Sequence, residues 1–302
     1  MRIVVTGGPG QLVLSLLERG AARDVEIIAV GPPELDLSAP DDERVFAALA
    51  AAHPDVIVNA AAHTAVDKAE SERELAFAIN ADGAGAVARA AARLGVPLVH
   101  VSTDYVFSGD KPEPYTEGDA PAPTGVYGAS KLAGEQAVLA SGADAAILRT
   151  AWVYSPFGAN FIKTMLRLAE TRDELGVVAD QRGNPTSALD LADAVLTVAG
   201  NLKSGAAPEL RGVFHATGSG EASWADFAEA IFAAAAAQGG RSARVKRITT
   251  AEYPTPARRP ANSRLDCSRL AQCHGVRLPD WHGSTAAVVV RLVHETLEGA
   301  KP

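Results

Sequence analysis

Hydrophobic and polar positions alternate in blocks along the first half of the chain. Short runs rich in Val, Ile and Leu are each followed by a longer segment in which apolar residues recur at helical spacing. The apolar runs predict strands near 2–6, 25–30, 55–59, 97–102 and 145–150. The longer segments predict helices near 10–19, 41–53, 72–94, 128–140 and 158–171. Strands that are apolar throughout are typical of a sheet covered on both faces. The order therefore predicts an α/β fold with a doubly wound parallel sheet.

The second half of the chain has a less regular pattern. It predicts helices near 188–202, 223–237 and 283–298, and strands near 212–216 and 244–248. Pro254, Pro256 and Pro260 mark a long irregular segment between them. We expect one domain over residues 1–150. We expect residues 151–302 to form mainly a second, smaller α/β lobe, with some segments returning to the first domain.

A glycine-rich turn joins the first predicted strand to the first predicted helix. Gly7-Gly-Pro-Gly10 follows the strand directly, and Gln11 and Leu12 open the helical pattern. Glycine lets a backbone approach a pyrophosphate closely, and a helix N-terminus offers free N–H groups and a positive dipole end. The arrangement predicts a dinucleotide site, although an ordinary tight turn would use the same residues.

Tyr127 and Lys131 stand four residues apart at the start of a predicted helix. This spacing places both side chains on one helix face. We expect the Lys131 ammonium to favour the phenolate and so to lower the pKa of Tyr127. Reduction of a carbonyl needs a group that delivers a proton to oxygen while hydride reaches carbon. The alternative is a solvated lysine beside a half-buried tyrosine.

Several motifs in order resemble those of the extended short-chain dehydrogenase/reductases. They are Gly7-x-x-Gly10, Asn59-Ala60-Ala61-Ala62, Ser102-Thr103-Asp104-Tyr105-Val106-Phe107 and Tyr127-x-x-x-Lys131. Further echoes point to the members that reduce the C4 carbonyl of dTDP-4-keto-6-deoxy sugars: Arg149-Thr-Ala-Trp-Val-Tyr154, Asp180-Gln-Arg-Gly-Asn-Pro-Thr186, Ser223-Trp224 and Tyr253-Pro-Thr-Pro-Ala-Arg-Arg-Pro260. The resemblance runs from Arg2 to about Asp266.

The resemblance implies a Rossmann-type dinucleotide-binding domain over residues 1–150 and a mainly substrate-binding domain over residues 151–302. Thr103, Tyr127 and Lys131 are the catalytic candidates. Tyr127 would protonate the substrate carbonyl oxygen, Thr103 would donate a hydrogen bond to it, and Lys131 would also reach the ribose hydroxyls of the nicotinamide. For Thr103 the alternative is a helix or turn cap, because Ser-Thr-Asp is typical capping chemistry.

The same resemblance assigns binding residues. The cofactor candidates are Gly7, Gly10, Gln11, Leu12, Asp36, Leu37, Ala60, Ala61, Ala62, Tyr127 and Lys131. The substrate candidates are Asp104, Tyr105, Trp152, Arg258 and Arg259. A guanidinium binds phosphate oxygens in pairs, so one or both arginines suit a diphosphate. Trp152 could instead pack in the core, and one of the two arginines could be merely solvated.

The implied activity is NAD(P)H-dependent reduction of the C4 keto group of dTDP-4-dehydro-L-rhamnose (dTDP-6-deoxy-L-lyxo-4-hexulose) to dTDP-L-rhamnose. The alternatives are a 4-ketoreductase for another dTDP-deoxysugar and a non-catalytic regulatory relative. The second strand ends without the acid that selects NAD, and no Arg stands there to hold a 2′-phosphate. We expect NADPH as the cofactor, with NADH also usable.

Val13, Ser15, Ser108 and Gly125 depart from the family pattern, and the first two bear on the cofactor turn and on assembly. Val13 stands where the third glycine of the cofactor turn is usual, and it could tilt the first helix or crowd the pyrophosphate. Ser15 stands where some relatives have a glutamate that holds an intersubunit magnesium ion. A hydroxyl is a poor substitute for a charged oxygen ligand. We therefore expect no metal, and a monomer or a metal-independent dimer.

Charge and composition exclude some partners. The net charge is −8 and the pI is about 5.4, which argues against nucleic acid as the main partner. The absence of a leader pattern and of a long apolar run predicts a cytoplasmic protein without membrane contact. Cys267 and Cys273 match no metal spacing, so we expect two reduced thiols. His63, His100 and His215 adjoin strands, where core or edge positions are more common than catalysis.

Overall fold

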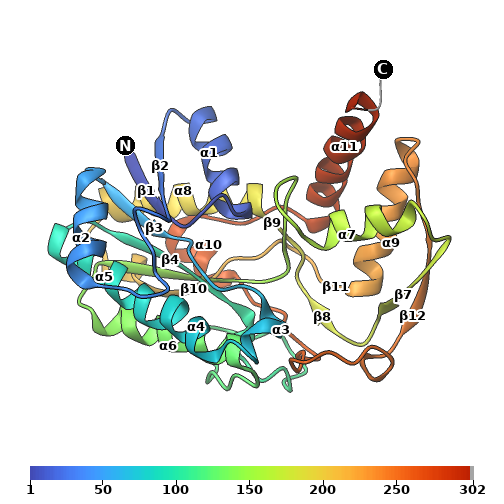
Figure 1. The fold of residues 1–302 in the computed structure, drawn as a ribbon, viewed down its shortest axis with the longest axis horizontal. Helices are drawn as coiled ribbons and strands as arrows, with labels where there is room; N and C mark the ends of the chain where they lie inside the picture. The colour runs from blue at the N-terminus through green and yellow to red at the C-terminus, as the bar shows by residue number, and fades with distance from the viewer. Residues whose placement is uncertain (300–302) are drawn as a thin grey trace.

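The computed structural model describes residues 1–299, which form two lobes joined side by side (Figure 1). The larger lobe contains a six-stranded sheet in the order β10-β5-β4-β3-β1-β2, and all five pairings are parallel. Its strands are β1 (Arg2–Thr6), β2 (Glu26–Val30), β3 (Val56–Asn59), β4 (Leu98–Thr103), β5 (Ala145–Thr150) and β10 (Gly212–His215). The predicted doubly wound parallel sheet is confirmed. Its order reverses between β1 and β3, where such sheets bind ligands beyond the carboxyl ends of the strands.

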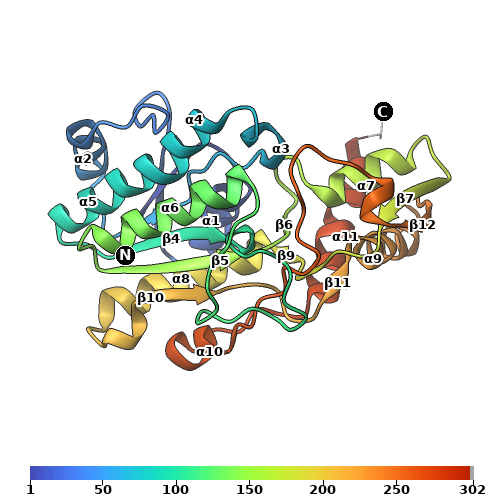
Figure 2. The same cartoon turned by 90° about the horizontal axis from the view of Figure 1, so that it is seen from below.

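Helices cover both faces of this sheet (Figure 2). One face packs against α1 (Gln11–Ala22), α8 (Ala188–Ser204) and α10 (Ser268–His274), and the other against α2 (Asp42–Ala51), α5 (Ala84–Leu94) and α6 (Val126–Ala140). Successive strand residues point to opposite faces, so Val5 joins the α1–α8 core while Val4 joins the α2–α5 core. Burial on both faces explains why these strands are apolar throughout.

The predicted single helix over 72–94 is wrong, because a π-helical turn interrupts it. The segment consists of α4 (Arg73–Phe77), the π-helix η1 (Ala78–Gly83) and α5. Inside the π-turn, the Asn80 amide donates to Ser130 Oγ at 2.9 Å and accepts from His63 N at 2.8 Å. A Cβ on Gly134 would lie 2.0 Å from the Asn80 carbonyl oxygen, so that glycine lets α6 approach closely. The π-turn thus joins α6 to the loop after β3.

The smaller lobe packs three helices against a pair of strands. The helices are α7 (Phe161–Ala169), α9 (Trp224–Ala237) and α11 (Trp281–Gly299), and β7 (Glu174–Val178) runs parallel to β12 (Arg244–Ile248). Two-residue strands pair as β6 (Val153–Tyr154) with β9 (Thr186–Ser187), and as β8 (Arg182–Gly183) with β11 (Ala222–Ser223). Short helical turns complete the chain: α3 (Val66–Ala69), η2 (Asp104–Val106), η3 (Pro208–Leu210) and η4 (Thr250–Glu252).

Several late segments return to the larger lobe. Helix α8, strand β10 and helix α10 contribute Leu191, Phe214 and Leu270 to the core beneath the six-stranded sheet. The core of the smaller lobe instead gathers residues from Tyr154 to Val293. We therefore propose that residues 1–150 form one domain and that residues 151–302 form mainly the other, with these three elements crossing back.

Val13 and Ser15, two of the departures from the family pattern, both face the interior. Val13 is 3% exposed and packs in the core between α1, β1 and α8. Ser15 is fully buried, and its Oγ donates to the Gln11 carbonyl oxygen at 2.8 Å. A residue turned inward in this way offers no ligand to a metal at the surface of α1.

The histidines and cysteines expected to be structural lie in or beside the core. His100 on β4 and His215 on β10 are fully buried, and both thiols, Cys267 and Cys273, are free. Within residues 1–299, no cluster of three His, Cys, Asp or Glu side chains is arranged to hold a metal ion. None of the helices over that range combines the length and apolar character needed to cross a bilayer.

Candidate active site

A cavity of about 760 Å³ opens at the carboxyl ends of β1, β3, β4 and β5. It brings together fourteen sequence-predicted residues: Gly7, Gly10, Gln11, Leu12, Ala60, Ala61, Ala62, Thr103, Asp104, Tyr105, Tyr127, Lys131, Trp152 and, from the departures, Val13. The strand register explains part of this grouping. Thr6 lies opposite Asn59, and Thr103 lies opposite Thr150, so the loops that follow these strands begin at one edge of the sheet.

The glycine turn forms one wall of the cavity and leaves space over its backbone. Gly7 has φ +122°, a left-handed value that favours glycine, and its Cβ would lie 3.3 Å from Ala61 Cα. A Cβ on Gly8 would meet nothing within 4 Å. Helix α1 begins after Gly10 without a side-chain cap, so its first N–H groups can serve an anion. The turn therefore fits the pyrophosphate of a dinucleotide.

Thr103 is the last residue of β4. Its side chain caps the short helix η2 and also lines the cavity. Its Oγ1 accepts from Tyr105 N at 3.2 Å, which caps the short helix η2, and donates to Asp104 Oδ1 at 2.9 Å. The capping alternative for Thr103 is thus present in the structure. It does not withdraw the side chain from the cavity, where Thr103 lies beside Tyr127.

Tyr127 lies half-buried in the cavity wall near the start of α6. Burial raises the pKa of its phenol, and nearby Asp104 adds to this, while the Thr103 hydroxyl acts in the opposite direction. Lys131 directs its Nζ to the Val101 carbonyl oxygen, at 2.7 Å. The expectation that Lys131 lowers the pKa of Tyr127 is therefore wrong for this structure. Tyr127 remains a neutral phenol, which is the form that donates a proton.

Lys131 is only 2% exposed. Burial lowers the pKa of its ammonium to about 8, and the negative charge of Glu135 opposes that shift. The ammonium is therefore the main form at neutral pH, but it loses its proton within the range of ordinary assays.

Asp104, Tyr105 and Trp152 surround the same end of the cavity. Burial raises the pKa of Asp104 to about 6. The Tyr105 ring meets the Tyr127 ring edge to face, with centroids 5.5 Å apart. Trp152 has a φ of 48° and stacks on Trp224 at 3.6 Å, against Gly183, where a Cβ would strike the indole. Trp152 is thus both a packing residue and a lining residue.

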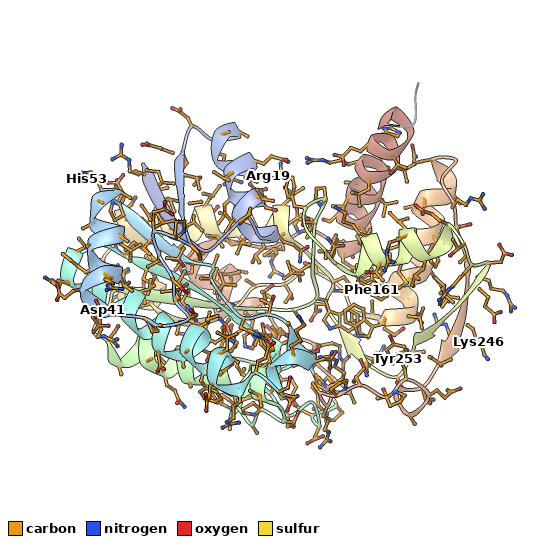
Figure 3. All side chains as sticks on the ribbon, viewed as in Figure 1. Arg19, Asp41, His53, Phe161, Lys246 and Tyr253 are labelled. Atoms are coloured by element: carbon orange, nitrogen blue, oxygen red, sulfur yellow. The ribbon has the colours of Figure 1, made fainter. Side chains whose placement is uncertain are left out.

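A second cavity of about 590 Å³ adjoins the first, and Val66 and Tyr105 line both. Its other walls come mainly from the smaller lobe, including Phe161 and Tyr253, which Figure 3 labels. Neither residue has a role predicted from the sequence. Tyr253 lies in a quoted family segment, but nothing in the sequence shows that its side chain is 59% exposed at a cavity wall.

The two candidate arginines occupy different environments. Arg259 lines the second cavity, where Nη2 pairs with Asp67 Oδ2 at 2.7 Å and Nη1 donates to the Tyr105 hydroxyl at 3.4 Å. Arg258 is 69% exposed, lies 3.8 Å from Asp110 and lines neither cavity. The structure therefore separates one arginine suited to an anionic ligand from one on the surface.

Asp36 and Leu37 lie outside the lining of either cavity. The Asp36 carboxylate accepts from Ser38 N at 2.8 Å, and Leu37 is buried in the core near α5. Gln11, in contrast, links the glycine turn to the smaller lobe. Its Oε1 accepts from Ser155 Oγ at 3.0 Å and from Asn160 Nδ2 at 3.1 Å.

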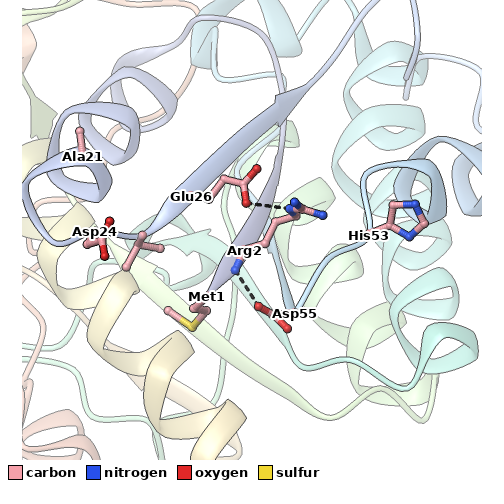
Figure 4. Close-up of a pocket in the computed structure, with 8 residues that line it drawn as sticks. Met1, Arg2, Ala21, Asp24, Glu26, His53 and Asp55 are labelled. Atoms are coloured by element: carbon pink, nitrogen blue, oxygen red, sulfur yellow. Dashed lines mark hydrogen bonds and ion pairs between the residues drawn. The ribbon is translucent and has the colours of Figure 1, made fainter.

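A third hollow, of about 540 Å³, lies at the opposite edge of the sheet (Figure 4). Arg2 is held within it, since Arg2 Nε donates to Glu26 at 2.9 Å and the backbone N of Arg2 donates to Asp55 at 2.7 Å. Ligands of parallel sheets bind at the carboxyl ends of the strands. This hollow at the amino ends is therefore not the candidate site.

The parallel sheet and the grouping of the glycine turn with Thr103, Tyr127 and Lys131 in one cavity are typical of oxidoreductases of the short-chain dehydrogenase/reductase class. Residues 1–294 match the family described as RmlD substrate binding domain, and the chain belongs to that family.

Relatives agree over nearly the whole chain. A dTDP-4-dehydrorhamnose reductase of Sinorhizobium fredii is 54% identical over 295 residues, covering 98% of this chain and 99% of that protein. The crystal structure of a dTDP-4-dehydrorhamnose reductase from Clostridium acetobutylicum is 40% identical, with a TM-score of 0.88. The match covers 97% of this chain and 99% of that chain. The crystal structure of the dTDP-4-dehydrorhamnose reductase from Bacillus anthracis in complex with NADP is 37% identical, with a TM-score of 0.88. The match covers 96% of this chain and 99% of that chain.

Proposed function

We propose that this protein reduces the C4 carbonyl of dTDP-4-dehydro-L-rhamnose to give dTDP-L-rhamnose, with NADPH as the hydride donor and NADH as a second choice. The observation that carries the proposal is the grouping of Thr103, Tyr127 and Lys131 in one cavity with the glycine turn. The names of the relatives and the NADP of the Bacillus anthracis structure support it.

The chain's own residues handle the proton. Bound NADPH supplies the hydride for the carbonyl carbon. Tyr127 donates the phenol proton to the carbonyl oxygen, for which its raised pKa keeps it protonated beforehand. Thr103 Oγ1 turns from Asp104 to donate a hydrogen bond to the same oxygen. Lys131, on the same face of α6 as Tyr127, reaches the ribose hydroxyls of the cofactor.

The cofactor rests on the residues around the glycine turn. Gly7 and Gly10 let the pyrophosphate approach, the N-terminus of α1 offers its N–H groups, and Gln11 and Leu12 open that helix. Ala60, Ala61 and Ala62 leave room for the nicotinamide half, and we retain Asp36 and Leu37 as the candidates near the adenine. Val30-Gly31-Pro32 ends β2 without an acid or an arginine, which leaves both NADPH and NADH usable.

The dTDP-sugar spans the two cavities. Asp104, Tyr105 and Trp152 lie beside Tyr127 and contact the sugar. The second cavity takes the nucleotide, because its aromatic walls suit a base and Arg259 suits a diphosphate. Arg258 is the weaker candidate of the two arginines, because it lies on the surface and lines neither cavity. The net charge of −8 makes such local arginines necessary for an anionic substrate.

The assembly we propose is a monomer or a dimer that needs no metal. The inward orientation of Ser15 supports this, since the residue bonds within α1.

Mixing the protein with NADPH and dTDP-4-dehydro-L-rhamnose tests the activity. We expect the absorbance of the reduced nicotinamide to fall in proportion to added sugar, with no fall when the sugar or the protein is left out. Turnover only with another dTDP-4-keto sugar would favour the alternative ketoreductase. No turnover with any such sugar, together with unimpaired NADPH binding, would favour a regulatory relative.

A further inference from the structure

A buried charged cluster lies directly behind the catalytic cavity, and the proposed proton transfer does not use it. Glu135 lies on α6 one turn after Lys131 and is 2% exposed. Arg149 on β5 and Ser102 on β4 are 4% and 3% exposed. Burying these groups is costly unless their charges are paired and hydrogen-bonded, so their contacts define what the cluster does.

The Glu135 carboxylate joins one helix to two strands. Its Oε1 accepts from Ser102 Oγ at 2.5 Å and from Arg149 Nε at 2.9 Å. Its Oε2 accepts from Arg149 Nη2 at 2.6 Å. Hydrogen bonds to charged groups of this kind are short and geometrically specific. The carboxylate thus fixes α6 against the carboxyl ends of β4 and β5.

These contacts lie close to the catalytic candidates: Ser102 is one residue from Thr103, and Glu135 is one helical turn from Lys131 and two from Tyr127. Ser102 precedes Thr103, and Val101, the next residue back, holds the Lys131 ammonium through its carbonyl oxygen. Tyr127, Lys131 and Glu135 follow one another at spacings of four residues along the same face of α6. A shift of α6 against β4 would therefore separate the proton donor from Thr103.

Glu135, which is itself paired with Arg149, is the nearby negative charge that favours the Lys131 ammonium. From β4, His100 faces Lys131 with both ring nitrogens unpaired within residues 1–299, and burial together with the Lys131 charge keeps its pKa well below the usual range. From β10, His215 is kept neutral by burial and by Arg149, with its pKa lowered to about 3. Asp104 lies toward the cavity and bonds Thr103. Arg149 also lies over the Phe107 ring.

We propose that Glu135 is a positioning residue, which holds β4 against α6 through Ser102 and Arg149 and places a buried carboxylate one helical turn from Lys131. This proposal rests on the function proposed above for Thr103, Tyr127 and Lys131. A buried ion pair is weak evidence for stability, because a well-packed apolar pair of similar volume often serves as well. A counter-charge for Lys131, in contrast, is something an apolar pair cannot supply.

Glu135→Gln tests the charge. Without the carboxylate, the pKa of Lys131 falls further below about 8, because burial disfavours the ammonium and the opposing negative charge is gone. Activity needs the protonated form and is lost as pH rises through that pKa. We expect the alkaline limb of the kcat–pH profile to move down by about one unit, and kcat at pH 8 to fall about fivefold, while KM for the sugar changes less than about twofold.

Titration of Lys131 by ¹³C NMR of labelled lysine, assigned with Lys131→Met, gives the same answer without substrate. It separates failure of this proposal from failure of the proposed function. An unchanged Lys131 titration in Glu135→Gln would overturn the role of Glu135, whatever the enzyme assay shows. Loss of sugar reduction by the wild type would concern the function alone.

Two further variants separate positioning from folding. Glu135→Gln with Arg149→Met removes both buried charges, so folding stability should return while the Lys131 titration stays shifted. If the double variant recovered the alkaline limb of the wild-type kcat–pH profile, Glu135 would have only a structural role. The matched control is Glu229→Gln in the smaller lobe, which loses an exposed bidentate pair with Arg247. Glu229→Gln should have the same alkaline limb of the kcat–pH profile, and the same kcat, as the wild type.

Discussion

The two adjoining cavities are built in opposite ways. The catalytic cavity lies at the edge of a six-stranded sheet, and its polar groups, such as Thr103, Lys131 and Asp104, are buried and held by hydrogen bonds. The second cavity draws on a two-stranded sheet and the irregular segment 249–259, and it presents the exposed ring of Tyr253.

This difference predicts which kinetic parameter, kcat or KM, each of the two cavities controls. Groups that must meet a transition state work best when the surrounding shell fixes them. Groups that only hold the substrate contribute equally before and during the reaction. Changes in the first cavity should therefore lower kcat, and changes in the second should mainly raise KM. The following variants either sharpen that contrast or break it.

Tyr127→Phe should have the largest effect. The variant lacks the proton donor but keeps the ring, so kcat should fall by at least about 10²-fold, the scale of general acid catalysis. KM for the sugar and Kd for NADPH should change little. Steady-state kinetics with titration of NADPH checks this, and near-normal turnover would remove Tyr127 from the mechanism.

Lys131→Met should affect both catalysis and cofactor binding, because one ammonium serves the phenol and the ribose. We expect kcat to fall by about 10-fold or more, together with a higher Kd for NADPH. Fluorescence titration of NADPH beside the kinetic assay measures both. If only the melting temperature changed, Lys131 would be a structural residue.

Arg259→Ala should raise KM for the dTDP-sugar by roughly 10-fold or more at nearly constant kcat, since a hydrogen bond to a charged group contributes about 1.5–3 kcal/mol. Arg258→Ala is the matched control, because that side chain lies on the surface. It should stay within about twofold of the wild type. A fall in kcat for Arg259→Ala at unchanged KM would break the contrast between the two cavities.

Val13→Gly should have a smaller effect. A glycine inside α1 costs up to about 1 kcal/mol of folding stability, and the loss of a buried side chain adds to this. Relieved crowding beside the cavity should lower the Kd for NADPH. Calorimetric titration decides the sign: weaker binding by the glycine variant would show that the wild-type turn accommodates Val13 without strain.

Chelation should have the smallest effect of all. Ser15 offers no carboxylate, so light scattering should give the same mass with and without EDTA. A dimer that falls apart on chelation would show that other carboxylates hold an ion between subunits.

Much of the larger lobe could be predicted from the sequence because the physics of its strands is local. Burial on both faces demands apolar runs, and all five strands predicted in residues 1–150 are present. Strand β7 escaped prediction because Glu174 and Gly176 interrupt its pattern, and two-residue strands such as β6 have no periodicity. The π-turn at Asn80 depends on partners 17 and 50 residues away, His63 and Ser130.

The sequence predicts most of the residues that line the candidate site, but not how their side chains are oriented or paired. Spacing places Tyr127 and Lys131 on one face of a helix, but it does not show that Lys131 points to the Val101 carbonyl. The sequence also could not separate Arg258 from Arg259, or place Asp36 outside the cavity. Glu135 drew no attention because a glutamate on a helix is normally solvated, and only the packing of α6 on the sheet buries it.

The most direct test uses NADPH that carries deuterium in the transferable position, together with dTDP-4-dehydro-L-rhamnose. The product is then identified by NMR. We predict dTDP-L-rhamnose with deuterium at C4, formed by the wild type and, at a rate lower by at least about 10²-fold, by Tyr127→Phe. A C4 epimer, or no transfer of deuterium to the sugar, would contradict the account.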